Sequence, residues 1–288
     1  MTARSARAPA KVNLFLHVGP VDAAGYHPLA SLAAFADVGD QVTVAPADVL
    51  SLAVEGPFAP ALSAHPDKLV LRALRRRGDT AGIGEPPLAV RLDKRLPVAA
   101  GLGGGSADAG AALKLARDVL GLDLDDAALA AVAAGVGADG PMCLHARAAW
   151  AEGRGERLAF EPGLPPLPAL LVNPGIPSPT AAVYRAYDSG PTAAADRPSP
   201  PARWTPDAVI DWLAAQRNDL EAPAVALQPV IGDVLAEVAE LPGAQLTRMS
   251  GSGATVFALF DGRAQAEAAG ALLAARRPAW WIAATLLS

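Results

Sequence analysis

A cluster of glycines forms the most chemically suggestive segment of this 288-residue chain. Gly101, Gly103, Gly104 and Gly105 fall within five positions, and an apolar pattern at helical spacing begins at Ser106 and continues to about residue 120. Backbone N–H groups in such a loop can converge on one anion, and the dipole of a following helix favours negative charge at its N-terminus. The segment therefore predicts a phosphate-binding loop.

Two common nucleotide-binding motifs do not match this loop. The Walker motif needs a lysine before its Ser or Thr, but Ser106 follows Gly105 directly. The dinucleotide fingerprint G-x-G-x-x-G fails because Ser106 stands three positions after Gly103. A glycine-rich loop alone is a weak signal, and a flexible linker is the alternative. Pro97 before the glycines and the helical pattern after them favour an anion site.

The elements that must position this loop follow from hydrophobic periodicity. Residues 10–18 alternate in character, which predicts a strand with Lys11 and Asn13 on the same face. Further strands are expected at 41–45, 88–93, 148–152, 169–172, 245–248, 254–260 and 280–286. Helices are expected at 68–77, 106–120, 125–134, 206–216, 230–240 and 264–276. Strands and helices mix without strict alternation, which predicts an α+β fold.

Two irregular segments stand out between these elements. Gly137–Pro141 predicts a turn, and the stretch 188–206, rich in Pro, Ala and Ser, predicts a mobile surface loop. His17 shares a strand face with Lys11 but belongs to no motif, so we interpret it as structural.

Composition excludes several classes of protein. The chain is 52% hydrophobic, but alanine contributes much of this value and no run approaches the roughly 20 strongly apolar residues that span a bilayer. A single cysteine, Cys143, excludes an intramolecular disulfide and a cysteine-based zinc cluster, and it suits a cytoplasmic protein. Net charge is −5, and the one basic cluster, residues 72–77, is typical of a solvated helix face. We expect a small-molecule substrate and no nucleic-acid, membrane or obligate protein partner.

The segment Pro97–Ala107 resembles the phosphate loop of the GHMP small-molecule kinases, P-x-x-x-G-L-G-G-G-S-S. Four further segments occur in the order seen in one branch of that family, whose substrate is a cytidine-diphosphate-linked methylerythritol. They are Pro9–Leu16, Gly25–His27, Gly137–Asp139 and Met249–Ala254. The resemblance covers essentially the whole chain. It implies a two-domain α+β fold, divided into residues 1–155 and 156–288, with the active site in the cleft between the domains.

The resemblance also implies an activity and its reacting groups. The family uses ATP, with Mg²⁺, to phosphorylate the 2-hydroxyl of this substrate on a non-mevalonate route to isoprenoid precursors. Asp139 would accept the proton of the hydroxyl or orient it, because a tertiary alcohol needs an acceptor as the O–P bond forms. Lys11 would keep that carboxylate ionised and offset negative charge on the phosphoryl oxygens.

Two sets of binding residues carry over with the motifs. The nucleotide set is Lys94, Pro97, Val98, Ala99, Ala100, Gly101, Leu102, Gly103, Gly104, Gly105, Ser106 and Ala107. The substrate set is Asn13, Tyr26, His27, Thr180 and Tyr184. Tyr26 would stack on the cytosine, His27 would hydrogen-bond it, and Tyr184 would supply a second aromatic ring. Lys94 would approach the adenine largely through its main chain.

Five positions depart from the family pattern. Ala99 and Ala100 stand where glycines or other small residues are frequent, and we expect them to be tolerated. Ala107 replaces a serine, Gly140 a valine and Lys68 an asparagine, and none of them removes a reacting group. We expect these departures to change affinity or rate and to leave the reaction type unchanged.

Several alternatives stay open. Asp139 could serve only as a helix N-cap, and Tyr26 and His27 could be ordinary packing residues. The glycines of Met249–Ala254 could let the C-terminal domain approach the phosphate loop closely or could only shape a turn. The chain could be another GHMP kinase, acting on homoserine, mevalonate or a sugar, or a non-catalytic nucleotide sensor. A dinucleotide-dependent oxidoreductase is disfavoured by the failed fingerprint.

Overall fold

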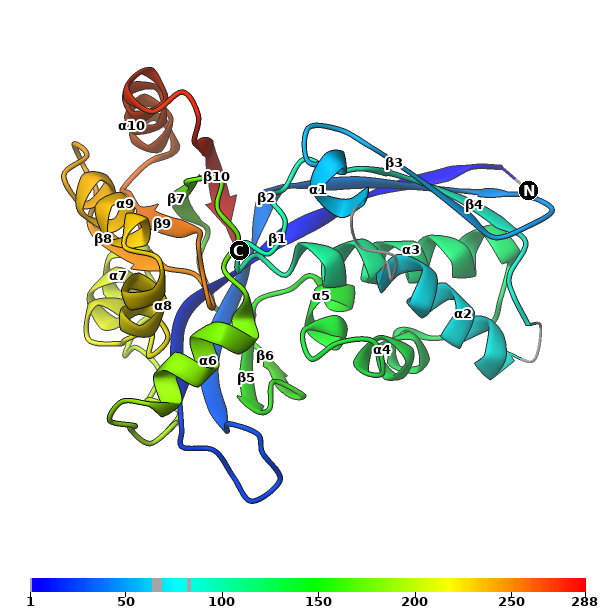
Figure 1. Cartoon of the computed structure of the whole chain (residues 1–288), viewed down its shortest axis with the longest axis horizontal. Helices are drawn as coiled ribbons and strands as arrows, with labels where there is room; N and C mark the ends of the chain where they lie inside the picture. The colour runs from blue at the N-terminus through cyan, green and yellow to red at the C-terminus, as the bar shows by residue number, and fades with distance from the viewer. Residues whose placement is uncertain (1, 64–68, 82–83) are drawn as a thin grey trace. The chain divides into compact units, whose positions relative to one another are not determined.

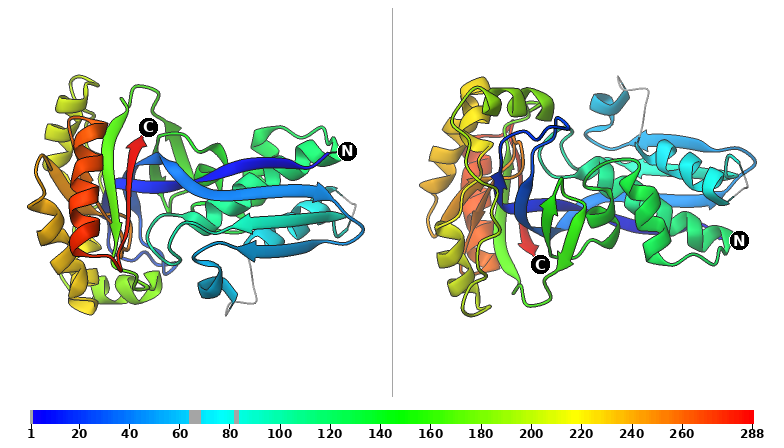
Figure 2. Two further views of the ribbon diagram at one scale, coloured as in Figure 1. Left: turned by 90° about the horizontal axis from the view of Figure 1, so that it is seen from above. Right: turned by 90° about the horizontal axis from the view of Figure 1, so that it is seen from below.

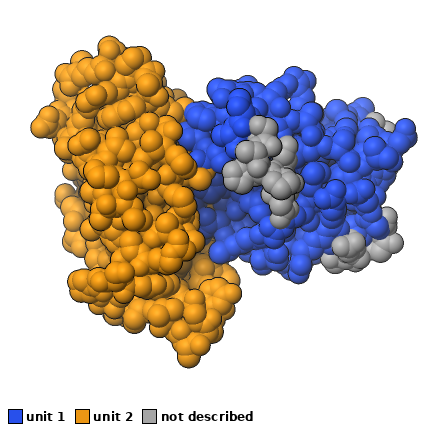
Figure 3. Space-filling view, viewed as in Figure 1, with its two compact units in different colours: residues 1–11, 39–98, 103–146 blue, residues 12–38, 99–102, 147–288 orange. Residues whose placement is uncertain are grey.

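The computed structural model describes residues 2–63, 69–81 and 84–288 (Figure 1). Lys68 therefore lies outside the described residues. The chain forms two compact units that are interleaved along the sequence (Figure 3). Unit 1 comprises residues 1–11, 39–98 and 103–146, and unit 2 comprises residues 12–38, 99–102 and 147–288. The division of the chain into family domains at residue 155 stays a prediction.

Unit 1 is a sheet with helices α2 to α5 on one face (Figure 1). Strand β4 pairs in parallel with β3, where Ser51 lies opposite Ala89, and antiparallel with β2, where Gln41 lies opposite Asp93. Helix α3 packs against α2, α5 and β4. The elements are β1 (Arg4–Val18) and β2 (Leu29–Pro46), each shared with unit 2, β3 (Ser51–Glu55), α1 (Ala59–Ser63), α2 (Leu69–Ala81), β4 (Leu88–Asp93), α3 (Gly104–Leu120), α4 (Asp126–Ala134) and α5 (Gly140–His145).

Unit 2 contains an antiparallel sheet in the order β6-β5-β2-β10-β7-β9-β8. Residues 169–172 of β7 are all fully buried, which explains their continuous apolar run. Helices α9 and α10 cover one face of the sheet (Figure 2). The elements that belong to unit 2 alone are β5 (Ala149–Gly153), β6 (Arg157–Phe160), β7 (Leu167–Asn173), α6 (Thr180–Asp188), α7 (Pro206–Ala214), α8 (Glu221–Leu227), α9 (Val230–Ala239), β8 (Leu246–Met249), β9 (Val256–Leu259), α10 (Arg263–Arg276) and β10 (Trp281–Leu287).

The predicted elements around the loop agree closely with the structure. The strand predicted at 88–93 is β4, and the helix predicted at 106–120 is α3, which begins two residues earlier at Gly104. The turn predicted at 137–141 needs a correction, because α5 already begins at Gly140. Pro141 suits that first helical turn, since it lacks an N–H that would have no partner there.

The predicted loop at 188–206 is hydrogen-bonded to other parts of unit 2, and its expected mobility stays a prediction. Most of the segment has no helix or strand, as expected. Nevertheless, its carbonyl oxygens accept hydrogen bonds from other parts of the unit: Asp196 from His17 Nδ1 (3.0 Å), Ser199 from Trp212 Nε1 (2.8 Å) and Ala194 from Arg217 (2.9 Å). His17 thus has the structural role that the sequence suggested.

Arg77, which the sequence placed on a solvated helix face, is instead a large polar side chain buried in the core of unit 1. Its side chain is fully buried, and none of its three guanidinium nitrogens has a hydrogen-bond partner among the described residues. Burial lowers the pKa of this guanidinium. An unsatisfied buried polar group costs about 1–3 kcal/mol, and a charged one costs more.

Replacing Arg77 by methionine is therefore expected to raise the free energy of unfolding by about 1–3 kcal/mol. Urea unfolding monitored by circular dichroism measures the change. Arg75→Met is the matched control, because Arg75 lies on the exposed face of α2 in a solvated pair with Glu85 (2.8 Å). Its expected effect is within about 0.5 kcal/mol. A destabilised Arg77→Met protein would show that the guanidinium has a favourable partner.

Within the described ranges, every helix is too short or too polar to cross a lipid bilayer.

Candidate active site

The phosphate loop ends at the N-terminus of α3. Gly103 is the N-cap and has a left-handed backbone, with φ of 62°. The left-handed backbone favours glycine, and a methyl group at this position would lie 3.2–3.3 Å from Cys143 Sγ and from side-chain carbons of Lys11, which would have to shift. The first turn of a helix presents N–H groups that lie outside the helical hydrogen-bond ladder. Here Gly104, Gly105 and Ser106 supply that turn.

Lys11 and Asp139 form an ion pair beside this turn. Lys11 Nζ lies 3.0 Å from Asp139 Oδ2, and the lysine side chain is 7% exposed while the aspartate side chain is 40% exposed. The Asp139 side chain makes no capping hydrogen bond, although the residue occupies the N-cap position of α5. Gly137 comes close to the Ser106 hydroxyl, because a methyl group at position 137 would lie 3.6 Å from it. Unit 1 thus gathers Lys11, Asp139 and the start of α3.

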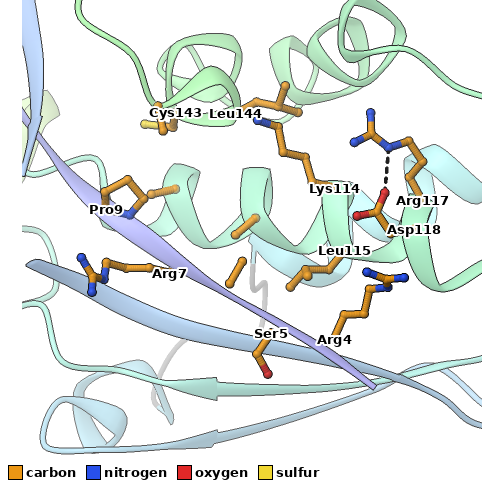
Figure 4. A pocket seen from close by; sticks show the side chains of 14 residues that line it. Arg4, Ser5, Arg7, Pro9, Lys114, Leu115, Arg117, Asp118, Cys143 and Leu144 are labelled. Atoms are coloured by element: carbon orange, nitrogen blue, oxygen red, sulfur yellow. Dashed lines mark hydrogen bonds and ion pairs between the residues drawn. The ribbon is translucent and has the colours of Figure 1, made fainter. Parts of the chain in front are cut away.

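A cavity of about 440 Å³ lies behind the loop helix, between β1 and α3 (Figure 4). Ala107 is the one predicted site residue in its lining, which also includes Cys143. Burial raises the pKa of the Cys143 thiol, which suits an inert core residue. The basic side chains of α3 here are already paired: Arg117 with Asp118 (3.2 Å) and Asp126 (2.7 Å), and Lys114 with Asp126 (3.8 Å).

The Lys94 side chain is buried, unlike a side chain that contacts a nucleotide directly. Its side chain is 3% exposed and pairs with Asp40 and Asp108 inside unit 1. Its side chain is therefore enclosed, and any contact with adenine would run through the main chain, as the resemblance implies. Pro97 and Val98 follow it in the segment between β4 and α3.

The middle of the loop, residues 99–102, is held within unit 2 by backbone contacts. Ser178 N donates to the carbonyl oxygen of Ala99 and Thr255 N donates to that of Ala100, each at 3.2 Å. The Ser250 hydroxyl donates to the carbonyl oxygen of Gly101 (2.9 Å). A methyl group on Gly101 would lie 2.2 Å from the carbonyl oxygen of Ser250, so this glycine is required for the close approach. Leu102 is buried.

The segment Met249–Ala254 therefore packs directly on the loop residues of unit 2. Ser250 also accepts a hydrogen bond from the backbone N–H of Asn13 (3.1 Å), whose side chain donates to Ser31 (2.8 Å). The Ser252 and Thr180 hydroxyls lie 2.9 Å apart. This contact network links Asn13 and Thr180, two predicted substrate residues, to the same segment.

Two of the three predicted aromatic residues of the substrate set contact each other in unit 2. The rings of His27 and Tyr184 have centroids 5.0 Å apart. His27 Nδ1 lies 2.9 Å from the carbonyl oxygen of Gly19, which can only accept, so Nδ1 carries the proton. His27 Nε2 lies 3.3 Å from Asp188 Oδ1.

Tyr26 is 52% exposed and does not join the His27–Tyr184 contact; the guanidinium of Arg154 lies 3.7 Å from the centre of its ring. Arg154, next to Tyr26, and Asp188, next to His27, lie outside the set of site residues predicted from the sequence. A basic residue between Gly153 and Gly155 was the available signal for the first, whereas nothing local marked the second.

The comparisons with known proteins agree on one family. The model of the GHMP kinases N terminal domain matches residues 68–147, and that of the GHMP kinases C terminal domain matches residues 208–276. The 4-diphosphocytidyl-2-C-methyl-D-erythritol kinase of Caulobacter vibrioides is 55% identical over 99% of both chains. A solved structure of 4-(cytidine 5'-diphospho)-2C-methyl-D-erythritol kinase is 33% identical over 99% of both chains, with a TM-score of 0.79.

A homoserine kinase from Cytophaga hutchinsonii, only 19% identical with a TM-score of 0.66 over 99% of this chain and 95% of that one, shares the fold alone. The expected α+β GHMP-kinase architecture and the ATP-dependent small-molecule kinase activity are thereby confirmed. The chain belongs to the 4-diphosphocytidyl-2-C-methyl-D-erythritol kinases, a family of GHMP kinases.

Proposed function

We propose that this chain transfers the terminal phosphoryl group of ATP to the 2-hydroxyl of 4-diphosphocytidyl-2-C-methyl-D-erythritol, a step in non-mevalonate isoprenoid synthesis. The observation that carries the proposal is the Lys11–Asp139 pair, 3.0 Å apart beside the start of α3. It is supported by the 55% identity to a kinase named for this substrate.

Asp139 is the acceptor for the hydroxyl proton in this proposal. Its carboxylate is partly exposed and is not used in helix capping, so it can reach a substrate hydroxyl. The Lys11 side chain is almost fully buried next to Asp139, and its ammonium holds the carboxylate in one orientation. The ammonium also offsets negative charge that spreads over the transferred phosphoryl oxygens.

The loop binds the phosphates of ATP in this proposal. N–H groups of Gly104, Gly105 and Ser106 point out of the first turn of α3, where the helix dipole favours an anion. Ala107 is buried in the same turn, so the hydroxyl of the family's second serine is replaced by a packed methyl group.

Mg²⁺ also belongs to the proposal, and the donors present suit it. Among the described residues no group of three or more His, Cys, Asp or Glu side chains could hold a metal ion. This suits a cation that takes most of its ligands from phosphates and water, with the Ser106 hydroxyl as the protein donor. When bound, Mg²⁺ would neutralise phosphate charge.

The aromatic residues of unit 2 select the cytidine substrate in this proposal. His27 is oriented by the Gly19 carbonyl oxygen and packs against Tyr184. Its Nε2 lies 3.3 Å from Asp188 Oδ1, so the base would take the place of that carboxylate as the partner of Nε2. Tyr26 offers an exposed ring to a base. Asn13 and Thr180, tied to the Met249–Ala254 segment, complete the substrate set.

Replacing His27 by alanine is expected to raise the KM for 4-diphosphocytidyl-2-C-methyl-D-erythritol about tenfold or more. The reason is that the hydrogen bond to the base and the ring contact that supports Tyr184, together worth about 1.4 kcal/mol or more, are lost. Steady-state kinetics measures the effect, and the KM for ATP serves as the internal control because His27 lies in the substrate set. An unchanged KM for the cytidylated substrate would contradict the substrate assignment.

The competing interpretations lack a specific observation in their favour. A non-catalytic sensor needs no partly exposed carboxylate held by a lysine, and the likeness to homoserine kinase extends to the fold alone. A cytoplasmic location, and the expectation that nucleic acid, membranes and obligate protein partners are not involved, stay predictions.

A further inference from the structure

Three buried charged side chains of unit 1 have no part in the proposed phosphoryl transfer. Asp40 lies in β2, Lys94 follows β4, and Asp108 lies in α3, and all three are at most 2% exposed. Lys94 Nζ donates to Asp108 Oδ2 (2.9 Å) and to Asp40 Oδ2. We refer to these three residues as the buried triad.

The buried triad ties the two ends of the phosphate loop together. Asp40 Oδ1 accepts hydrogen bonds from the backbone N–H groups of Arg95 (2.6 Å) and Leu96 (2.8 Å), immediately before the loop. Through Lys94, the same carboxylate is connected to Asp108, in the helix that follows the loop. One hydrogen-bonded unit thus fixes the chain on both sides of the glycines.

The buried triad also lies directly beneath the phosphate-binding turn. A methyl group on Gly104 would be 3.1 Å from Lys94 Nζ and 3.7 Å from Asp40 Oδ2. The ammonium therefore sits under the first residue of α3, where positive charge supports an anion on the other side of the backbone.

Burying three charged side chains in a core costs desolvation free energy. Asp108 Oδ1 is buried without a hydrogen-bond partner among the described residues. Burial raises the pKa of Asp108 to about 7, against the opposing effect of Lys94. Apolar side chains of similar size often replace buried ion pairs without loss of stability, so stability alone does not explain these three charges.

We propose that Asp40, Lys94 and Asp108 are positioning residues that hold the phosphate loop in its ATP-binding shape. A loop with four glycines has many accessible conformations, and a ligand that must order it binds more weakly. The inference rests on the proposed function, since it assigns the phosphates of ATP to this loop.

Three variants test the proposal. Asp108→Ala removes one acceptor from Lys94 and is expected to raise the KM and Kd for ATP about tenfold, with the KM for the cytidylated substrate unchanged. Asp108→Asn keeps an oxygen that can face Lys94 and is expected to stay within about threefold of the parent protein. The double variant Asp40→Asn/Lys94→Met removes one charge of each sign, and the asparagine keeps an oxygen for the N–H groups of Arg95 and Leu96. The remaining carboxyl, Asp108, has a raised pKa and can stay neutral. The double variant is expected to unfold at the same temperature as the parent or higher, yet to bind ATP about tenfold more weakly.

Hydrogen exchange of backbone amides in the protein without ATP provides the second measurement. Amides of residues 98–107 are expected to exchange faster in Asp108→Ala and in the double variant, with little change elsewhere. Lys114→Met is the matched control on α3, since Lys114 makes only a 3.8 Å pair with Asp126. We expect it to behave like the parent protein.

The proposal is overturned if the double variant keeps parental ATP affinity and parental loop exchange. It is also overturned if the losses spread evenly over all amides and over both KM values, as for general destabilisation. Failure of the proposed function looks different, because the parent protein would then not bind ATP. The exchange data without ATP would still show whether the buried triad orders the loop.

Discussion

Asp139→Asn is expected to lower kcat by about 10²- to 10⁴-fold, the usual contribution of a positioned acid or base. Asparagine keeps the shape of the side chain and can still accept a hydrogen bond from Lys11, but it cannot take a proton from the substrate hydroxyl. Because the side chain makes no capping hydrogen bond, the change should not disturb the start of α5. Affinity for ATP is expected to stay within about threefold.

Single-turnover kinetics and calorimetric titration with ATP measure these two quantities. Asp123→Asn is the matched control, because Asp123 is an exposed aspartate of unit 1 between α3 and α4. It is expected to leave both quantities unchanged. Turnover of Asp139→Asn at the parental rate would remove Asp139 from its catalytic role.

Lys11→Met is the second change with a large expected effect, a fall in kcat of about 10²- to 10³-fold. The ammonium pairs with the Asp139 carboxylate, and the lysine side chain is only 7% exposed, so water cannot fully replace its charge. Removing one preorganised charge or donor from a transition state typically has this cost. The KM for ATP should also rise, because Lys11 touches the Gly103 position of the loop.

Lys11→Arg distinguishes charge from shape. It keeps the positive charge, but the larger guanidinium must fit beside Gly103, where a methyl group would lie only 3.3 Å from side-chain carbons of Lys11. We expect it to recover part of the activity, to about tenfold below the parent. Equal kcat values for Lys11→Met and the parent protein would contradict the assigned role of the charge.

Local sequence signals predicted the strands and helices that flank the loop. The strand at 88–93 and the helix α4, with its Asp125 N-cap accepting from Ala128 N (2.8 Å), follow from alternation, helical spacing and capping residues. The first half of β2 was missed because residues 30–36 are all buried, which leaves no alternation to detect. Helix α6 was missed because the short segment after Pro179 carries no strong periodic signal of its own.

The residues of the candidate site that belong to sequence motifs could be predicted. The glycine loop indicated a phosphate, and the resemblance brought in Lys11 and Asp139, whose pairing depends on how β1 and the Gly137–Asp139 turn fold. The buried triad had no local signal, because its lysine joins carboxylates 54 and 14 positions away in the sequence. Contacts of that kind depend on tertiary structure.

The most direct test of the central claim is ADP formation by the parent protein with a panel of alcohols at matched concentrations. The panel contains 4-diphosphocytidyl-2-C-methyl-D-erythritol, homoserine, mevalonate and galactose, and phosphorus NMR identifies the product. We expect ADP and the 2-phosphorylated cytidine compound in equal amounts, with kcat/KM at least about 100-fold above that of the other alcohols. An equal or larger kcat/KM for homoserine, mevalonate or galactose, or ATP that is not consumed with any of them, would contradict the account.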